Sequence, residues 1–255
     1  MRKAYLDLPY GQMHYRYAGE GTPIILLHMS GSSSDEYEKV GDILTSKGYQ
    51  VFAPDFMGFG GSDRPDHYFS FPEHAASIKA FSDALQIRSA CIAGNLVGAD
   101  VAAHIAVSYP ELVKKVVMFH ICDPELYAAF RETAFSVIPI TEDGSHMMTM
   151  WKRSHKYGDP PEISNARCIN LHKAADWGEA LHWALTEDAP FGTYLPQLAC
   201  KAKVFAYPAM EHETTKKAAE MMQNCEYELL EKATPYFSRS SPEEYVEKIL
   251  EVFLD

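Results

Sequence analysis

The segment from Cys91 to Met118, CIAGNLVGADVAAHIAVSYPELVKKVVM, constrains the fold more than any other part of the chain. It begins with a short apolar run, passes through a turn framed by Gly94 and Gly98, and continues as a helical pattern followed by an aliphatic run. A strand, a helix and a second strand in direct succession indicate one unit of a parallel sheet covered by helices. The two glycines permit a tight turn around Leu96, because glycine adopts backbone conformations that other residues disfavour.

The same alternation recurs along the chain and predicts an α/β fold with a doubly wound, mostly parallel sheet. An antiparallel hairpin with Gly11 at its turn is expected first. The apolar run PIILLH that follows is typical of a strand buried on both faces. The last helix is expected to start with a capping box, formed by Ser240 or Ser241 with Glu243 or Glu244. Strands are predicted at 23–28, 49–56, 89–94, 114–122, 202–210 and 226–231, with helices at 35–48, 71–85, 97–110, 214–223 and 241–254.

The alternation stops after Pro124 and returns near Pro196. The intervening residues are rich in helix formers, methionine and aromatics and contain no buried-strand pattern. We therefore predict a core formed by residues 1–123 and 196–255, with residues 124–195 inserted as a helical cap. Ordinary helical packing and a lid over a substrate are both open interpretations of this insertion.

The composition of the chain limits the kinds of molecule that we expect it to bind. The formal net charge is −12 without a basic run, which argues against nucleic acid and membranes as partners. Five cysteines without a C-x-x-C spacing, together with scattered histidines, predict neither disulfides nor a metal site. The glycines at 58, 60 and 61 do not form a dinucleotide fingerprint, so no cofactor is expected. The N-terminal residues lack an apolar signal core, which favours a cytoplasmic protein. The expected partner is an apolar small molecule, and a homodimer stays open.

Several motifs together resemble the α/β-hydrolase-fold proteins. APDFMGFGGSDRP is similar to a signature loop of that family, GNLVG resembles its nucleophile elbow, and SPEEYVEKILEVF resembles its final helix. The resemblance covers essentially the whole core. It implies a nucleophile at position 96, a general-base histidine before the last helix, and an oxyanion hole formed by the backbone N–H groups of Val97 and Ser30.

The chain departs from that pattern at two separate positions. Leu96 occupies the nucleophile position and has neither a lone pair nor an ionisable group. Counting back from the final helix places Pro235 where the resemblance implies the histidine, while Glu211 aligns with the family's acid. The paired departures indicate a site that has abandoned covalent catalysis.

Candidate site residues follow from the rule that ligands gather at the carboxyl ends of parallel strands. Titratable groups at these ends make up the catalytic candidates, and a purely structural role stays open for each of them. The substrate-binding candidates surround the elbow or supply aromatic surface from the insertion. The catalytic candidates are His28, His120, Asp123 and Glu211; the binding candidates are Met29, Ser30, Asn95, Leu96, Val97, Trp151, Trp177 and Trp183.

Three functions are compatible with this set. The leading hypothesis is a cofactor-independent, non-hydrolytic cyclase, pericyclase, isomerase or lyase that acts on an apolar carbonyl compound by confinement and hydrogen-bond polarisation. A catalytically silent, receptor-like binding protein is the first alternative. The second is a hydrolase with a displaced constellation, with Ser30 or Cys122 as nucleophile and His28 or His120 as base.

Overall fold

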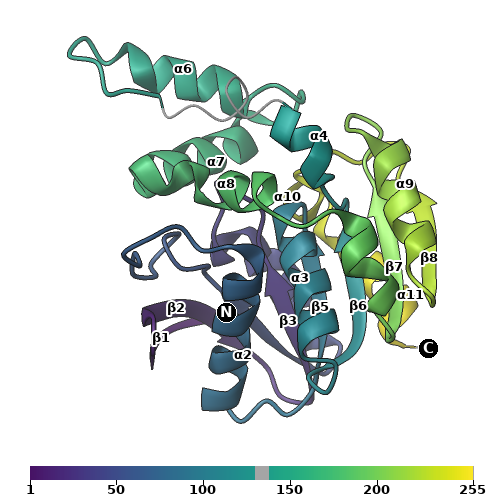
Figure 1. Cartoon of the computed structure of the whole chain (residues 1–255). Helices are drawn as coiled ribbons and strands as arrows, with labels where there is room; N and C mark the ends of the chain where they lie inside the picture. The colour runs from purple at the N-terminus through teal and green to yellow at the C-terminus, as the bar shows by residue number, and fades with distance from the viewer. Residues whose placement is uncertain (130–137, 255) are drawn as a thin grey trace.

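The computed structural model describes residues 1–129 and 138–254, which are built around an eight-stranded sheet of order β1-β2-β4-β3-β5-β6-β7-β8 (Figure 1). Strand β2 runs antiparallel to β1 and β4, and the other neighbours are parallel, as predicted. The parallel strands therefore bring their carboxyl ends to one edge. The strands are β1 Arg2–Leu8, β2 Gly11–Ala18, β3 Thr22–Leu27, β4 Tyr49–Pro54, β5 Ala90–Asn95, β6 Val113–Phe119, β7 Lys201–Ala206 and β8 Cys225–Leu229.

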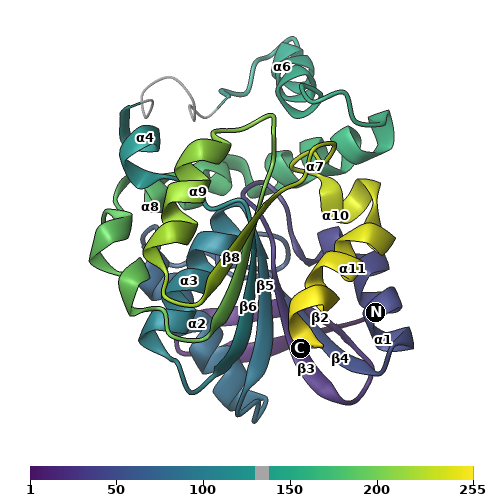
Figure 2. The ribbon, with the colours of Figure 1, turned by 90° about the vertical axis from the view of Figure 1, so that its right-hand side faces the viewer.

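Helices cover both faces of the sheet (Figure 2). One face carries α1 Glu38–Ser46 and α11 Pro242–Phe253, and the other carries α2 Phe71–Ala84, α3 Val97–Ser108 and α9 His212–Met221. Successive residues of a strand point to opposite faces. Accordingly, Ile24 and Leu26 of β3 belong to the core beneath α1 and α11, while Ile25 and Leu27 belong to the core beneath α2 and α3. This division explains why the run has no polar alternation.

The start of the last helix differs from the prediction. Ser241 is the N-cap residue of α11, but its side chain makes no capping hydrogen bond, so the predicted capping box is wrong. Pro242 at the first helical position supplies a preset φ and needs no hydrogen-bond acceptor. A capping box is present instead at α2, between Ser70 and Glu73.

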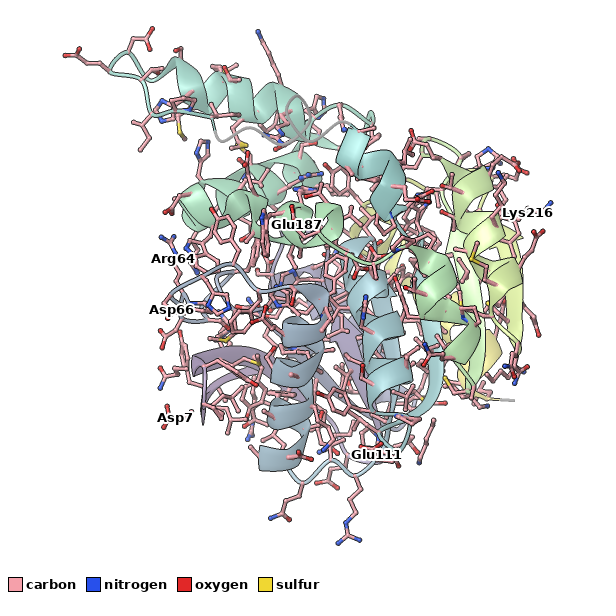
Figure 3. The ribbon with its side chains drawn as sticks, in the orientation of Figure 1. Asp7, Arg64, Asp66, Glu111, Glu187 and Lys216 are labelled. Carbon is pink, nitrogen blue, oxygen red and sulfur yellow. The ribbon has the colours of Figure 1, made fainter. Side chains whose placement is uncertain are left out.

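The segment between β6 and β7, named the cap here, contains helices but no strand among its described residues. It lies over the carboxyl ends of the parallel strands, with α6 outermost (Figure 1). Arg64, labelled in Figure 3, fastens a core loop to the cap: its Nη1 donates to Asp176 Oδ1 at 3.1 Å and its Nη2 to the carbonyl of Ala174 at 3.0 Å. The described part of the cap comprises α4 Pro124–Ala129, α6 Ser145–Ser154, α7 Pro161–Ala174, η2 Ala175–Glu179, α8 Ala180–Thr186, η3 Phe191–Thr193 and η4 Leu195–Gln197.

The remaining helical elements of the described chain are short, namely η1 Ser34–Tyr37 and α10 Phe237–Ser240. A search of the described helices finds none with the length and apolarity that crossing a membrane requires.

Candidate active site

Leu96 lies in a sharp turn between β5 and α3. Its φ of 51° and ψ of −125° place it in a region that a leucine rarely adopts. Its N–H donates to the carbonyl of Phe119 at 2.8 Å, and its own carbonyl accepts from the N–H of Ala99 at 2.6 Å. These bonds fix both sides of the turn, and the Leu96 side chain is half-buried at the carboxyl edge of the sheet.

The two glycines that frame the turn are required by close backbone packing. A Cβ on Gly94 would lie 2.1 Å from the carbonyl oxygen of Gly98, and a Cβ on Gly98 would lie 2.2 Å from that of Leu27. Neither clash can be relieved by a side-chain movement, because the obstructing atoms are backbone. The GNLVG sequence therefore forms the predicted turn, and Leu96 and Val97 of this turn line the cavity above it.

A cavity of about 190 Å³ lies over Leu96 and is named the elbow cavity here. Its floor holds the apolar residues expected from the sequence, namely Met29, Leu96 and Val97. Pro235 also lines it, so the two positions at which the chain departs from the family pattern meet in one cavity. The further lining residues are Ser30, Cys122, Tyr127, Arg153, Lys156, Tyr157, Arg167, His182, Leu185 and Met210.

Three cationic side chains from the cap face this floor. Arg153 and Lys156 come from α6 and the loop after it, and Arg167 comes from α7. The Nη1 of Arg167 donates to the hydroxyl of Tyr236 at 2.8 Å, and that hydroxyl donates to the carbonyl of Ser154 at 3.0 Å. The apolar floor therefore has a cationic roof, formed by Arg153, Lys156 and Arg167.

Ser30 and His182 form the polar pair nearest to the elbow. Ser30 Oγ lies 3.3 Å from His182 Nδ1, and both residues line the elbow cavity. Burial and the nearby cations Arg167, Arg153 and Lys156 lower the pKa of His182 to about 3. The ring is therefore neutral near pH 7 and is suited to hydrogen bonding more than to binding a proton.

The backbone around the cavity also offers donors. Within residues 1–129 and 138–254, neither the N–H of Ser30 nor that of Val97 donates to a protein acceptor. Val97 is the first residue of α3, where the N–H groups lack intrahelical partners and the helix dipole is positive. These two groups are the donors that the sequence suggested for an oxyanion hole.

The structure places His28 beneath the loop and outside the lining of the elbow cavity. It is fully buried, its Nδ1 lies 2.8 Å from the carbonyl of Met29, and its Nε2 accepts from the N–H of Phe56 at 3.0 Å. Both ring nitrogens are thus occupied by backbone groups. His28 holds the loop that carries Ser30 and is not positioned to act as a base.

The other three catalytic candidates also lie outside this lining. His120 is buried, its Nδ1 accepts from the N–H of Tyr207, and burial lowers its pKa to about 3. Asp123 Oδ1 accepts from the N–H of Glu125 at 3.0 Å at the start of α4. Glu211 is exposed and is the N-cap residue of α9. All three hold chain segments together or face solvent.

Asn95 supports the elbow from behind and is fully buried. Its Nδ2 donates to Glu36 Oε1 at 2.9 Å and to the carbonyl of Pro235 at 3.0 Å, while its Oδ1 accepts from the hydroxyl of Tyr207 at 2.9 Å. Every polar atom of this amide is satisfied by protein. It positions the two loops that meet at the elbow cavity.

The three tryptophans proposed for ligand contact pack within the protein instead. Trp177 is buried against Gly58 and lies edge-on to Tyr68, at 5.0 Å between ring centroids. Trp183 approaches the same tyrosine at 6.0 Å, and Trp151 stacks on His155 at 5.4 Å. The aromatic surface of the elbow cavity comes from Tyr127 and Tyr157, which the sequence reasoning missed.

The missed residues had weak signals in the sequence. Lys152, Arg153 and Lys156 form the densest basic stretch of the cap, but only Arg153 and Lys156 reach the cavity. Arg167 and His182 sit in unremarkable helical contexts. Cys122 does line the cavity, yet burial and the nearby Asp100 raise its pKa well above the usual range, so it stays a thiol. Among the described residues no cluster of His, Cys, Asp or Glu could hold a metal ion.

Comparison with known proteins gives a consistent fold. A family model described as alpha/beta hydrolase fold matches residues 22–133. The chain is 38% identical over 105 residues to a 2-hydroxymuconate semialdehyde hydrolase of Pseudomonas putida, covering 39% of this chain and 36% of that protein. It is 34% identical over 118 residues to a 2-hydroxy-6-oxo-6-phenylhexa-2,4-dienoate hydrolase of Comamonas testosteroni, covering 44% and 41%. These alignments span only about a third of the length of the curated relatives that the chain matches first.

Solved structures match over nearly the whole chain. The enol-lactonase from Burkholderia xenovorans LB400 superposes with a TM-score of 0.80 at 16% identity, covering 99% of this chain and 100% of that one. A hydrolase from Pseudomonas aeruginosa PA01 gives 0.81 at 16% identity, covering 98% and 97%. At such low identity these matches establish the fold, and the chemistry has to be argued from the residues of the site.

Proposed function

We propose that this chain, which has the α/β-hydrolase fold, is a cofactor-independent, non-hydrolytic enzyme that acts on a small carbonyl-bearing anion. The reaction class is that of cyclases, isomerases and lyases. The single observation that carries the proposal is Leu96 in the strained turn where the fold presents a nucleophile. A leucine side chain cannot attack a carbonyl, so an acyl-enzyme or ester intermediate cannot form at that position.

The remaining groups suit electrostatic catalysis. A substrate carbonyl above Leu96 would lie near the N–H groups of Ser30 and Val97 and near the positive end of α3. Such donors stabilise an enolate or oxyanion as it develops, with no covalent bond to the protein. The Ser30 hydroxyl, held by its contact with His182, can then pass a proton between neighbouring substrate atoms, because a hydroxyl both donates and accepts.

The cationic roof indicates the substrate's charge. Arg153, Lys156 and Arg167 together favour a carboxylate, and a guanidinium binds a carboxylate through well-directed hydrogen bonds. Two curated relatives carry names that denote a semialdehyde and a dienoate, both of them carbonyl compounds with an acid group. An unsaturated 2-oxo carboxylate combines the anionic end, the carbonyl and the apolar body that the cavity favours.

A displaced hydrolase is the second candidate, and the 3.3 Å contact between Ser30 and His182 favours it. In that reaction His182 would have to remove the proton of Ser30. A general base works best with a pKa near the working pH, and the pKa of His182 is lowered to about 3. The pair is therefore poorly suited to activating a serine nucleophile.

The test is turnover in water enriched in ¹⁸O, with benzylidenepyruvate and related unsaturated 2-oxo carboxylates as substrates and mass spectrometry as readout. We expect conversion without an added cofactor and without ¹⁸O in a newly formed carboxylate. Leu96→Ala should keep this activity, whereas His182→Phe should reduce it. Arg88→Met, an exposed change far from the cavity, serves as the control.

Two results would contradict the proposal. A labelled carboxylate that disappears in Ser30→Ala would establish the displaced hydrolase. Tight binding of the panel, with every compound recovered unchanged, would establish a binding protein instead.

A further inference from the structure

A second cavity lies entirely within the cap, and we name it the cap chamber. Its volume is about 380 Å³, twice that of the elbow cavity. No residue of the sheet or of the helices flanking it contributes to its lining. The lining residues are Ile138, Pro139, Ile140, His146, Met150, Arg153, Arg167, Leu171, His172, Ala175, Asp176, Gly178, Glu179 and His182.

The chamber and the elbow cavity are neighbours that share part of their lining. Arg153, Arg167 and His182 line both spaces, and none of the other lining residues does. The two cavities also differ in chemistry. The elbow cavity places cations over an apolar floor, whereas the chamber has an apolar side formed by Ile138, Met150 and Leu171.

Three buried polar atoms on the chamber wall have no hydrogen-bond partner among the described residues. They are Arg167 Nε, His172 Nε2 and Glu179 Oε1. Leaving a buried polar atom unpaired costs folding free energy, so such atoms are normally satisfied by a partner. The three atoms come from two elements, Arg167 and His172 from α7 and Glu179 from η2, and all three residues line a space large enough for a small molecule.

The unpaired atoms of the wall favour a ligand that carries a neutral polar group. Burial raises the pKa of Glu179 and lowers that of His172, and both shifts favour the uncharged forms of these groups. The carboxylate of Asp176, by contrast, is already paired with Arg64. Arg167 Nε offers a donor and Glu179 Oε1 an acceptor, a combination that a hydroxyl group matches because it both accepts and donates.

We propose that the cap chamber is a second small-molecule site, which takes a neutral, largely apolar compound bearing a hydroxyl group, such as a fused-ring phenol. The apolar body packs against Ile138, Met150 and Leu171, and the hydroxyl bonds to the unpaired atoms of Arg167 and Glu179. The site goes beyond the proposed function and does not depend on the chemistry at Leu96.

Binding of 2-naphthol to the full chain, measured by equilibrium dialysis, tests this site. The matched probe is 2-methylnaphthalene, in which a methyl group replaces the hydroxyl. We expect 2-naphthol to bind about tenfold more tightly than 2-methylnaphthalene. The methyl compound would leave the polar atoms of the wall buried without a hydrogen-bond partner, whereas the hydroxyl of 2-naphthol pairs with them. In Glu179→Leu the preference for 2-naphthol should shrink, because the acceptor is lost.

The chain offers a filling variant with a matched control. A Cβ on Gly178 would lie 3.8 Å from Leu171 Cδ2, an ordinary contact, so Gly178→Phe can direct its ring into the chamber. Gly192 has no neighbour within 4 Å of a Cβ and lies outside both cavities, so Gly192→Phe makes the same change elsewhere. We expect 2-naphthol binding to be lost in the first variant and kept in the second.

A crystal of the wild-type protein grown with 6-bromo-2-naphthol locates the bound ligand independently, through the anomalous signal of its bromine. This experiment tests the site even if Gly178→Phe does not fold. Bromine among Met150, Leu171 and Glu179 supports the proposal. The inference is overturned if the wild-type chain binds neither probe, if Gly178→Phe folds and binds 2-naphthol as well as wild type, or if the bromine lies over Leu96.

Discussion

The side-chain amide of Asn95 donates a hydrogen bond of 3.0 Å to the backbone carbonyl of Pro235. This bond joins the turn that presents Leu96 to the loop after β8, two segments separated by 140 positions in the sequence. In a family member with nucleophile and histidine in place, the same two segments would carry the reacting pair. Here they carry a leucine and a proline, yet they remain fastened together.

Removing this amide should destabilise the protein. Asn95→Ala leaves the hydroxyl of Tyr207 and the carbonyl of Pro235 buried without their partner, and it deprives Glu36 of one of its donors. We expect the free energy of unfolding in urea to fall by about 2–4 kcal/mol. Asn224→Ala, on the exposed turn before β8, should change it by less than about 0.5 kcal/mol. A loss in Asn95→Ala no larger than that of the control would contradict the tethering role.

Restoring the nucleophile alone should not restore ester hydrolysis. In Leu96→Ser the new hydroxyl lacks a base, because Pro235 stands at the histidine position and the pKa of His182 is lowered to about 3. We expect p-nitrophenyl acetate turnover indistinguishable from that of wild type. The double variant Leu96→Ser with Pro235→His should exceed the single variant by at least about tenfold, since a positioned base contributes strongly to such reactions. Strong turnover in Leu96→Ser alone would mean that a base lies elsewhere in the cavity.

Acid should destabilise the protein through its buried histidines. His74 is fully buried, neither ring nitrogen has a partner among the described residues, and burial lowers its pKa from 6.5 to about 3. Between these two values the unfolded chain binds a proton that the folded protein does not. The free energy of unfolding therefore falls as the pH falls through this window, by about 1.4 kcal/mol per pH unit for this group.

Replacing His74 with leucine should remove that contribution. We expect His74→Leu to be at least as stable as wild type at pH 7, because two unpaired polar atoms are lost, and to show a shallower decline between pH 6.5 and 3 in urea unfolding. His67→Leu is the control. His67 is exposed beside Asp66 and Glu73, which raise its pKa, so its removal cannot make the decline shallower between pH 6.5 and about 5. The two variants are compared in that upper part of the window, because His67 lowers the pKa of both carboxyl groups, which titrate below it. An unchanged decline in His74→Leu would show that His74 titrates normally.

The cationic roof should control binding of an anion in the elbow cavity. Arg167→Met is expected to weaken benzylidenepyruvate binding by about tenfold or more and to reduce its dependence on salt, because a charge-assisted contact is removed. Tyr236→Phe should have a smaller effect, since it removes only the hydroxyl that positions Arg167. Arg88→Met should bind as wild type does in isothermal titration calorimetry. Equal affinities in all four proteins would place the anion away from Arg167.

The core could be predicted from sequence because its signals are local. The aliphatic run of β3 must be covered on both faces. The elbow needs its two glycines because Gly94 packs against the backbone of Gly98, and Gly98 packs against the backbone of the neighbouring strand β3. The capping box predicted at the last helix is absent, because Pro242 at the first helical position accounts for the helix start and the Ser241 side chain is not needed there.

The cap side of the site could not be predicted for a different reason. Arg153, Arg167 and His182 meet above Leu96 only because α6, α7 and α8 fold back over the strand ends, and that arrangement depends on contacts between residues far apart in sequence. His28 and Asp123 illustrate the converse. The sequence places His28 directly after β3, as the structure does, but it predicts a strand to 122, whereas β6 ends at Phe119 and Asp123 directly precedes α4. The hydrogen bonds of both residues to backbone groups do not follow from the sequence.

The backbone around Leu96 has a consequence for how such a protein can change over time. Carbonyl oxygens of Gly98 and Leu27 crowd the framing glycines, and hydrogen bonds to Phe119 and Ala99 hold the turn, so its shape is set by atoms that every amino acid shares. The shape of the turn therefore does not depend on which side chain stands at position 96. A lineage can lose a nucleophile at this position, explore other chemistry, and regain one later without rebuilding the scaffold.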